Sequence, residues 1–307
     1  MSHYSVMAIR KPNNDTSIEE SMEFYNEELE VAPYVDKSYL EIVEEGRELL
    51  DSTLDKECIE IIVDGGTKKE WRDKIIETYP SLAHSDKEQI ENMWKFDKKR
   101  ADLFVESKKR EITDDEYHDL AVEYNSYECN KHGDSLCSYN PNSKWDWYVE
   151  GGRWSGQLIL KKEAAERYGT DRVNSALYKE IDWAKMNSLT DAERDHYIDI
   201  WKYHVMEEPF PGTDEEKKER LGWFLYRKEW YLERYKTLDN FLDSMARWTT
   251  HAVLDDEGEW HEAGEMGWFG VSSAETDDEI AWEKGFSKNF IEGLPADTRI
   301  TILDCHI

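Results

Sequence analysis

The sequence predicts an α+β fold, in which both chain ends and the centre form a mainly antiparallel sheet that carries large helical insertions. Three observations support this class. Both ends of the chain have strand patterns, short strand patterns recur around glycine turns, and helix-start motifs fall between them. Terminal strands of one sheet bring the two chain ends together.

The two terminal strands follow from alternation and turn residues. The segment His3–Ile9 alternates polar and apolar residues, then becomes apolar, and a Lys-Pro-Asn-Asn turn follows it. The segment Arg299–Ile307 repeats this pattern after a Leu-Pro-Ala-Asp turn. Both patterns are typical of strands bounded by turns.

Further strands are predicted at the centre and near the C-terminus. Glycine turns join two pairs of these segments into hairpins, across Glu150–Gly152 and Asp255–Gly258. The predicted segments are Cys58–Val63, Trp145–Val149, Gln157–Leu160, Thr250–Leu254, Glu259–His261 and Trp268–Val271.

Helices are predicted from the capping box, in which a hydroxyl and a glutamate three residues later satisfy free backbone donors at a helix start. The matches are Ser85–Glu88, Thr113–Glu116, Thr190–Glu193, Thr213–Glu216 and Thr276–Glu279. The helix from Asp214 to Tyr235 is predicted to be the longest. We expect a sheet-containing core from residues 1–64, 140–162 and 248–307, with helical insertions at 65–139 and 163–247.

Charge is the strongest compositional signal. The 307 residues include 69 Asp and Glu against 39 Lys and Arg, which gives a net charge of −30, yet 13 Trp and 17 Tyr supply a core that acidic disordered chains lack. Such a surface repels nucleic acid and anionic membranes and attracts basic surfaces. We therefore expect a protein partner with a basic surface, and no direct contact with nucleic acid or membrane.

The expected location is the cytoplasm. No apolar run reaches the length of a membrane helix, and the first residues do not form a secretory signal. The four cysteines are scattered, so reduced thiols are expected rather than a disulfide framework.

The segment Trp145–Gly156 is the densest in aromatic residues and glycines. A flat ligand would stack on Trp147 or Trp154 while Arg153 pairs with a phosphate or carboxylate. The segment Gly264–Gly270 would lie beside it if the two hairpins share a sheet. The candidate binding residues are Trp145, Trp147, Arg153, Trp154, Trp268 and Phe269. The alternative, which we favour, is that these aromatic residues pack in the core and Arg153 forms an internal ion pair.

A metal site is weakly indicated by Cys129, His132 and Cys137, which lie in one loop and carry zinc-type donors. The fourth ligand is not adjacent, and the spacing does not match a paired knuckle, so ordinary loop residues are the alternative. No cofactor and no resident metal are expected.

Two clusters could support catalysis. His3 and Asp304–His306 share the terminal strands, but Cys305 and His306 point to opposite faces and cannot form a dyad. His251 and His261 could face each other across the hairpin, with Asp146 or Glu265 as orienting carboxylate, as in an acid–base hydrolase. This site would require three separate contacts among the two histidines and the carboxylate. We therefore assign no catalytic residue and expect no enzyme.

Four segments carry a resemblance to known sequences: Met1–Val6, Trp145–Gly156, Gly264–Gly270 and Asp304–Ile307. Together they resemble a group of bacteriophage-encoded proteins, mostly uncharacterised, which implies a phage or prophage origin and assigns no reaction. By phage character, size and acidity the chain is also similar to the Gabija anti-defence family, non-enzymatic factors that assemble around a host nuclease complex and block its access to DNA. No diagnostic motif carries this second resemblance.

The leading functional hypothesis is an acidic phage inhibitor that docks on a host anti-phage defence complex and blocks DNA access. Rim carboxylates would speed association, and exposed aromatic residues would supply affinity. Such an inhibitor would act in the host cytoplasm and is expected to self-associate when it forms a shell. The alternative is a sponge that sequesters a nucleotide-derived immune signal in a pocket formed by Trp147, Arg153, Trp154 and Trp268. An acid–base enzyme is the third hypothesis.

Overall fold

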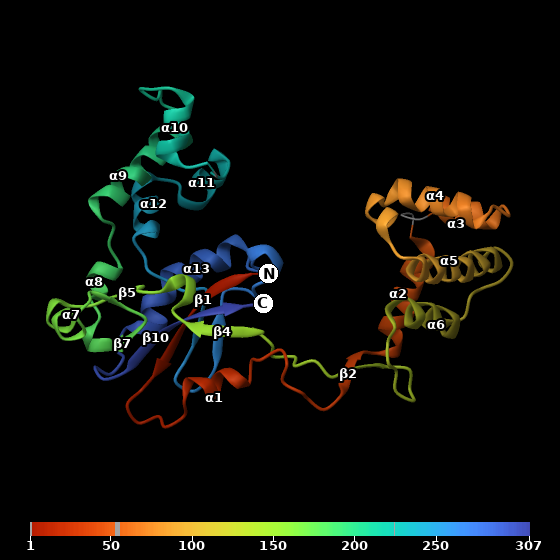
Figure 1. The fold of residues 1–307 in the computed structure, drawn as a ribbon, viewed down its shortest axis with the longest axis horizontal. Helices are drawn as coiled ribbons and strands as arrows, with labels where there is room; N and C mark the ends of the chain where they lie inside the picture. Colours follow the sequence, from red (N-terminus) through yellow and green to blue (C-terminus); the bar gives the residue numbers. More distant parts are fainter. Residues whose placement is uncertain (1, 53–55, 224) are drawn as a thin grey trace. The chain divides into compact units, whose positions relative to one another are not determined.

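The computed structural model describes residues 2–52, 56–223 and 225–307, apart from the side chain of Trp268. The chain divides into two compact units (Figure 1). The first contains Met1–Leu29 and Asn140–Ile307, and the second is the inserted segment Glu30–Tyr139. The first predicted insertion thus begins at residue 30 rather than 65, and the predicted insertion 163–247 is part of the first compact unit.

The first unit is built on the sheet predicted from the chain ends. Strand β1 (His3–Arg10) pairs antiparallel with β10 (Arg299–His306) over its whole length. The sheet order is β4-β10-β1-β8-β9, and β7 also pairs with β10. The further strands are β4 (Trp147–Glu150), β7 (Ser175–Leu177), β8 (Ala252–Leu254) and β9 (Trp260–Glu262). All described pairs are antiparallel except β1 with β8, so the α+β prediction is confirmed.

Helices complete the first unit. The α-helices are α1 (Ile18–Glu23), α7 (Lys162–Tyr168), α8 (Trp183–Met186), α9 (Asp191–Ile200), α10 (Asp214–Leu221), α11 (Lys228–Tyr235), α12 (Leu238–Met245) and α13 (Thr276–Phe286). Shorter helical segments are η2 (Gly152–Trp154), η3 (Tyr178–Glu180), η4 (Trp201–Val205), η5 (Trp268–Gly270) and η6 (Ser287–Ile291). Segment α13–η6 packs on one face of this sheet and α1 on the other. Helices α9 to α12 pack against one another in a separate cluster. A small ladder pairs β5 (Leu158–Ile159) with β6 (Arg172–Val173).

The inserted unit is mostly helical. A short ladder of β2 (Tyr34–Lys37) and β3 (Ser135–Cys137) carries its two chain connections. Its helices are α2 (Tyr39–Asp51), α3 (Lys56–Val63), α4 (Lys68–Thr78), η1 (Pro80–His84), α5 (Lys87–Ser107) and α6 (Asp114–Asn125). Buried Cys58, Trp71, Ile75 and Ile90 hold α3, α4 and α5 together.

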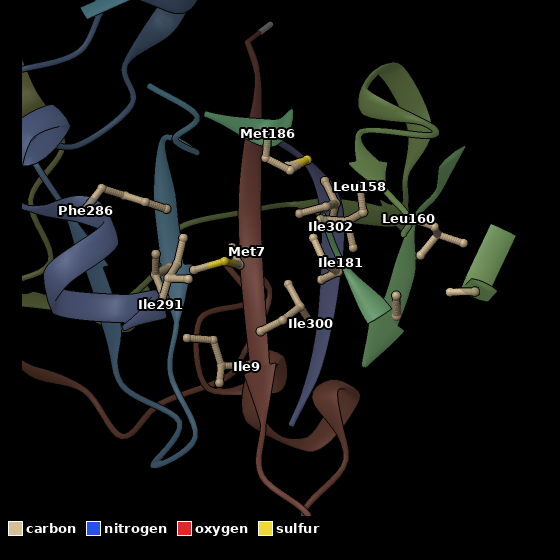
Figure 2. Packing of buried hydrophobic residues seen from close by; sticks show 13 residues of the cluster. Met7, Ile9, Leu158, Leu160, Ile181, Met186, Phe286, Ile291, Ile300 and Ile302 are labelled. Carbon is tan, nitrogen blue, oxygen red and sulfur yellow. The ribbon is translucent and has the colours of Figure 1, made fainter. Parts of the chain in front are cut away.

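Strand alternation gives the main sheet two different cores. On one face Met7, Ile300 and Ile302 pack against Phe286 and Ile291 of the α13–η6 segment (Figure 2). The opposite face buries residues such as Val6 and Leu303 beneath α1. Residues of opposite parity along β1 therefore belong to separate clusters.

Four sequence predictions about elements are wrong. The segment Cys58–Val63 is helix α3, because its packing against α4 and α5 outweighs the strand preference of its β-branched residues. Trp268–Val271 contains the short helix η5 instead of a strand. The predicted hairpin across Glu150–Gly152 does not form, since β4 pairs with β10 and β5 with β6. The predicted helix Asp214–Tyr235 is divided at Gly222, whose φ is 96°.

Candidate functional site

A polar cluster occupies one end of the sheet face that carries Met7 and Ile302. His3 pairs in register with His306, which in turn pairs with Trp147 of β4. Asp304 lies two residues before His306, so strand alternation places it on the same face. The register of three strands thus brings residues from both chain ends and the centre together.

Each histidine of this cluster is held by a carboxylate. His3 Nδ1 lies 2.9 Å from Asp304 Oδ1, and His306 Nδ1 lies 2.6 Å from Asp146 Oδ1. The two imidazole rings meet edge to face, with 4.9 Å between their centroids. Asp304 is only 2% exposed and His306 6%, whereas the side chain of Asp146 is 29% exposed, so each hydrogen bond is partly buried.

The glycine turn after β4 completes the hydrogen bonding of Asp304. Its Oδ2 atom accepts a hydrogen bond from the backbone N–H of Arg153 at 2.9 Å. Gly152 has φ of 50°, and a Cβ atom there would lie 2.3 Å from the same oxygen. Glycine is therefore required, because a side chain would push the turn away from the buried carboxylate.

Trp147 and Arg153 offer binding groups at this cluster. The Trp147 side chain is 43% exposed and stacks on His306 with an interplanar angle of 17°. The exposed guanidinium of Arg153 makes no ion pair or hydrogen bond with any residue that the structure describes. The internal ion pair considered for Arg153 is therefore absent within the described residues, and its charge is available to a ligand.

The other predicted binding residues do not join this cluster. Trp145 is 6% exposed and donates its indole N–H to the Met22 carbonyl, so it is a core residue. Trp154 is half-buried and packs against the apolar cluster around Met7. Phe269 is 84% exposed on the η5 loop, and the side chain of Trp268 lies outside the described structure.

The predicted acid–base group of His251, His261 and Asp146 does not assemble. His261 pairs in register with Val253, not with His251, and its Nε2 lies 2.7 Å from Asp255. His251 instead lies 3.8 Å from Glu262, and burial lowers its pKa. Asp146 binds His306, while the other proposed orienting carboxylate, Glu265, forms an ion pair with Lys144.

The cysteines form neither a metal site nor a disulfide in the described structure. No group of three or more metal-binding side chains occurs among the described residues, so Cys129, His132 and Cys137 do not converge on one ion. All four cysteines are free. Cys305 points into the apolar cluster beneath α1, on the sheet face opposite His306, as predicted. Burial there raises the pKa of its thiol.

The cluster suits proton transfer and the recognition of anions. An imidazole with Nδ1 held by a carboxylate presents Nε2 as an acceptor when neutral and as a donor when protonated. For His3 and His306, Nε2 makes no hydrogen bond within the described part of the chain. Two such rings and a stacking tryptophan can bind a small ligand that carries a flat ring. Arg153, held to Asp304 by its backbone N–H, brings a positive charge to the same turn.

The sequence does not predict that Asp146 belongs to this cluster. The sequence predicts that His3 lies near the Asp304–His306 segment, but it places Asp146 beside His251 and His261, whereas Asp146 binds His306. Asp146 directly precedes Trp147, the residue that pairs with His306. Only the register of β4 against β10 carries that information.

Comparison with known proteins provides no assignment. No family model, curated protein or solved structure matches this chain. The resemblance to phage-encoded proteins and to the Gabija anti-defence family stays a prediction. Among the described helices, none combines the length and apolar character needed to cross a bilayer.

Proposed function

We propose that this protein binds and sequesters a small anionic ligand with a flat ring, of the nucleotide class, at the cluster of Trp147, Arg153, His3 and His306. One observation carries this proposal: the exposed Trp147 ring stacks on a carboxylate-held histidine, and Arg153, whose exposed side chain makes no ion pair within the described structure, is held at the same cluster by its backbone N–H on Asp304. These groups can engage a ring and a phosphate together.

The energetics favour a ligand that uses both features. Stacking of a base on an aromatic side chain contributes about 1–3 kcal/mol. The Arg153 guanidinium can form paired, charge-assisted hydrogen bonds with a phosphate. A net charge of −30 disfavours the approach of any anion, so the positive charge of Arg153 must offset it locally.

The test is to incubate the protein with cyclic dinucleotides and mononucleotides, isolate the complex and release the ligand by heat. Recovery of the intact nucleotide is the expected result. Recovery of a cleaved product would replace sequestration by acid–base hydrolysis through His3 and His306. Failure to retain any member of this nucleotide panel would contradict the proposal.

Two variants locate the ligand. Replacing Trp147 by alanine or Arg153 by glutamine should each weaken binding about tenfold or more, because each removes stacking or a charged hydrogen bond. Trp223, 72% exposed, and the exposed Arg194 provide matched controls. The control variants Trp223→Ala and Arg194→Gln should leave nucleotide binding unchanged.

A second candidate function is docking on a basic protein surface, as an inhibitor of a host anti-phage defence complex. The exposed apolar side chains of the η5 region favour it, since Phe269 is 84% and Val271 66% exposed. Ser2 fixes this loop by donating to the Gly267 carbonyl and accepting from the Gly270 N–H. A fixed, exposed aromatic residue on an acidic protein is a suitable anchor for a partner.

Phe269 and Trp147 separate the two candidates. Loss of partner capture in Phe269→Ala, with nucleotide retention intact, would support docking. Loss of nucleotide retention in Trp147→Ala, with partner capture intact, would support sequestration.

A further inference from the structure

A small pocket between α11, α12 and α13 has an unusual concentration of positive charge. Its volume is about 140 Å³, and four cationic side chains line it: Arg234, Lys236, Arg247 and Lys284. Glu283 is the single carboxylate-bearing residue among those described as lining it. In a chain with a net charge of −30, this is a local reversal of sign.

Arg234 is a fixed cation of the pocket. Its side chain is 5% exposed and forms ion pairs with Glu279 at 2.6 Å and Glu283 at 2.7 Å. Ser244 donates a hydrogen bond to the second oxygen of Glu283 at 2.8 Å. The Nε atom of Arg234 is buried and has no hydrogen-bond partner in the described structure. The guanidinium of Arg234 thus adds a buried positive charge to the pocket wall, partly offset by its two carboxylate partners.

The other three cations are not neutralised. Lys236, Arg247 and Lys284 make no ion pair with any described residue. Elsewhere lysines of this protein readily find carboxylates, as Lys144 does with Glu262 and Glu265. Three unpaired cations around one pocket repel each other, and a bound anion would remove that repulsion.

The backbone at Lys236 supports a ligand role. Lys236 ends α11 with φ of 66°, a conformation that residues other than glycine rarely adopt. A glycine at position 236 would relieve this backbone strain, but it would also remove the positive charge of the lysine. Strained residues of this kind are concentrated at binding and catalytic sites.

The size of the pocket selects the ligand. At about 140 Å³ it is much larger than the roughly 10–15 Å³ that one water molecule needs. It is smaller than the roughly 300–1,000 Å³ of sites that enclose drug-sized molecules. One phosphate group fits these limits, and the remainder of a phosphomonoester would lie outside.

We propose that Arg234, Lys236, Arg247 and Lys284 form a binding site for a single phosphate group, either inorganic phosphate or the phosphoryl end of a small phosphomonoester. No residue of this site belongs to the Trp147 cluster. The proposal therefore stands whether or not a nucleotide binds there.

The test is calorimetric titration of the full chain in a low-salt buffer, with inorganic phosphate in one arm and glycerol 3-phosphate in the other. Saturable binding is expected in at least one arm, and the tighter arm identifies the source. Absence of saturable binding in both arms would overturn the proposal.

Two variants and a control assign any binding to this pocket. Arg247→Gln and Lys236→Gly should each weaken phosphate binding about tenfold, since each removes a charged donor. Lys236→Gly should also unfold at an equal or higher temperature, so weaker binding would not reflect unfolding. Lys288→Gln removes an exposed lysine of η6 and should change nothing. Equal affinity of the wild type and Arg247→Gln would overturn the site.

Discussion

At the scale of residues, Gly152 and Asp304 depend on each other. The carboxylate of Asp304 receives the Arg153 N–H because Gly152 allows the turn to approach without a side chain. The sequence predicts the Gly-Gly turn as the tip of a hairpin, which the structure does not contain. Its role depends on a residue about 150 positions away, which local turn patterns do not encode.

The substitution Gly152→Ala should lower the free energy of unfolding by at least about 2 kcal/mol, from backbone strain and the clash with Asp304. Gly293→Ala is the matched control, because Gly293 has φ of 83° and open space around it. Strain alone should lower its free energy of unfolding by about 1 kcal/mol. Urea denaturation measures both values, and equal losses would show that the clash is relieved.

His251 should make stability depend on pH. Burial lowers its pKa below 6.5, although nearby Glu262 partly opposes the shift. Below pH 6.5 the unfolded chain binds a proton more readily at this position than the folded chain, so stability falls as pH decreases from 6.5 towards the folded pKa. His251→Phe keeps a ring against Tyr4 but does not titrate. Urea denaturation across this range should show a shallower loss in the variant, and identical slopes would contradict the assignment.

At the scale of elements, capping boxes were the most reliable sequence signal. Three of the predicted boxes, at Thr113, Thr190 and Thr213, are present. The other two are wrong: Asp86 rather than Ser85 caps α5, and α13 begins at Thr276 without a side-chain cap. The same motif also caps α1, α2 and α4, which were not predicted from it. The motif is local, so it needs no tertiary information.

The substitution Thr190→Ala should destabilise the first unit by about 1 kcal/mol, because α9 loses its side-chain cap. Thr276→Ala is the matched control, since Thr276 is the first helical residue of α13 and provides no cap. The substitution Thr276→Ala should change the stability of the first unit by nearly zero. Thermal unfolding of the two variants measures the difference, and a larger loss in Thr276→Ala would contradict the cap assignment.

At the scale of the molecule, the inserted unit enters and leaves the first unit at neighbouring points. Glu27 donates its N–H to the Trp145 carbonyl at 2.9 Å. The Asn140 side chain donates to the Phe24 and Asn26 carbonyls at 2.8 and 2.9 Å. The two apolar cores of the sheet also contain only residues of the first unit.

Replacement of residues 30–139 by a short Gly-Ser linker should therefore leave the first unit folded, because its cores and sheet remain complete. Circular dichroism and a cooperative thermal transition would show this. A chain that unfolds without cooperativity would mean that the insertion supplies essential packing.

Charge gives the docking candidate its own prediction. Capture of a basic partner should weaken steeply as salt rises, because exposed carboxylates are screened over about 10 Å at 0.1 M salt. Pull-down at increasing ionic strength measures this, with Phe269→Ala as the test of the apolar anchor. An affinity unchanged across the salt series would contradict the electrostatic component.

The sequence by itself determined the charge, the two terminal strands and three helix starts, because composition and short-range patterns encode these features. It also indicated Trp147 and Arg153, although exposure rather than composition separates them from Trp145 and Trp154. Only the tertiary structure decided which side chains meet. The register of β1, β10 and β4 joins His3, Asp146 and His306, and helix packing gathers the four cations of the proposed phosphate site. Both arrangements join residues far apart in sequence, and the free energy of the whole fold selects such contacts.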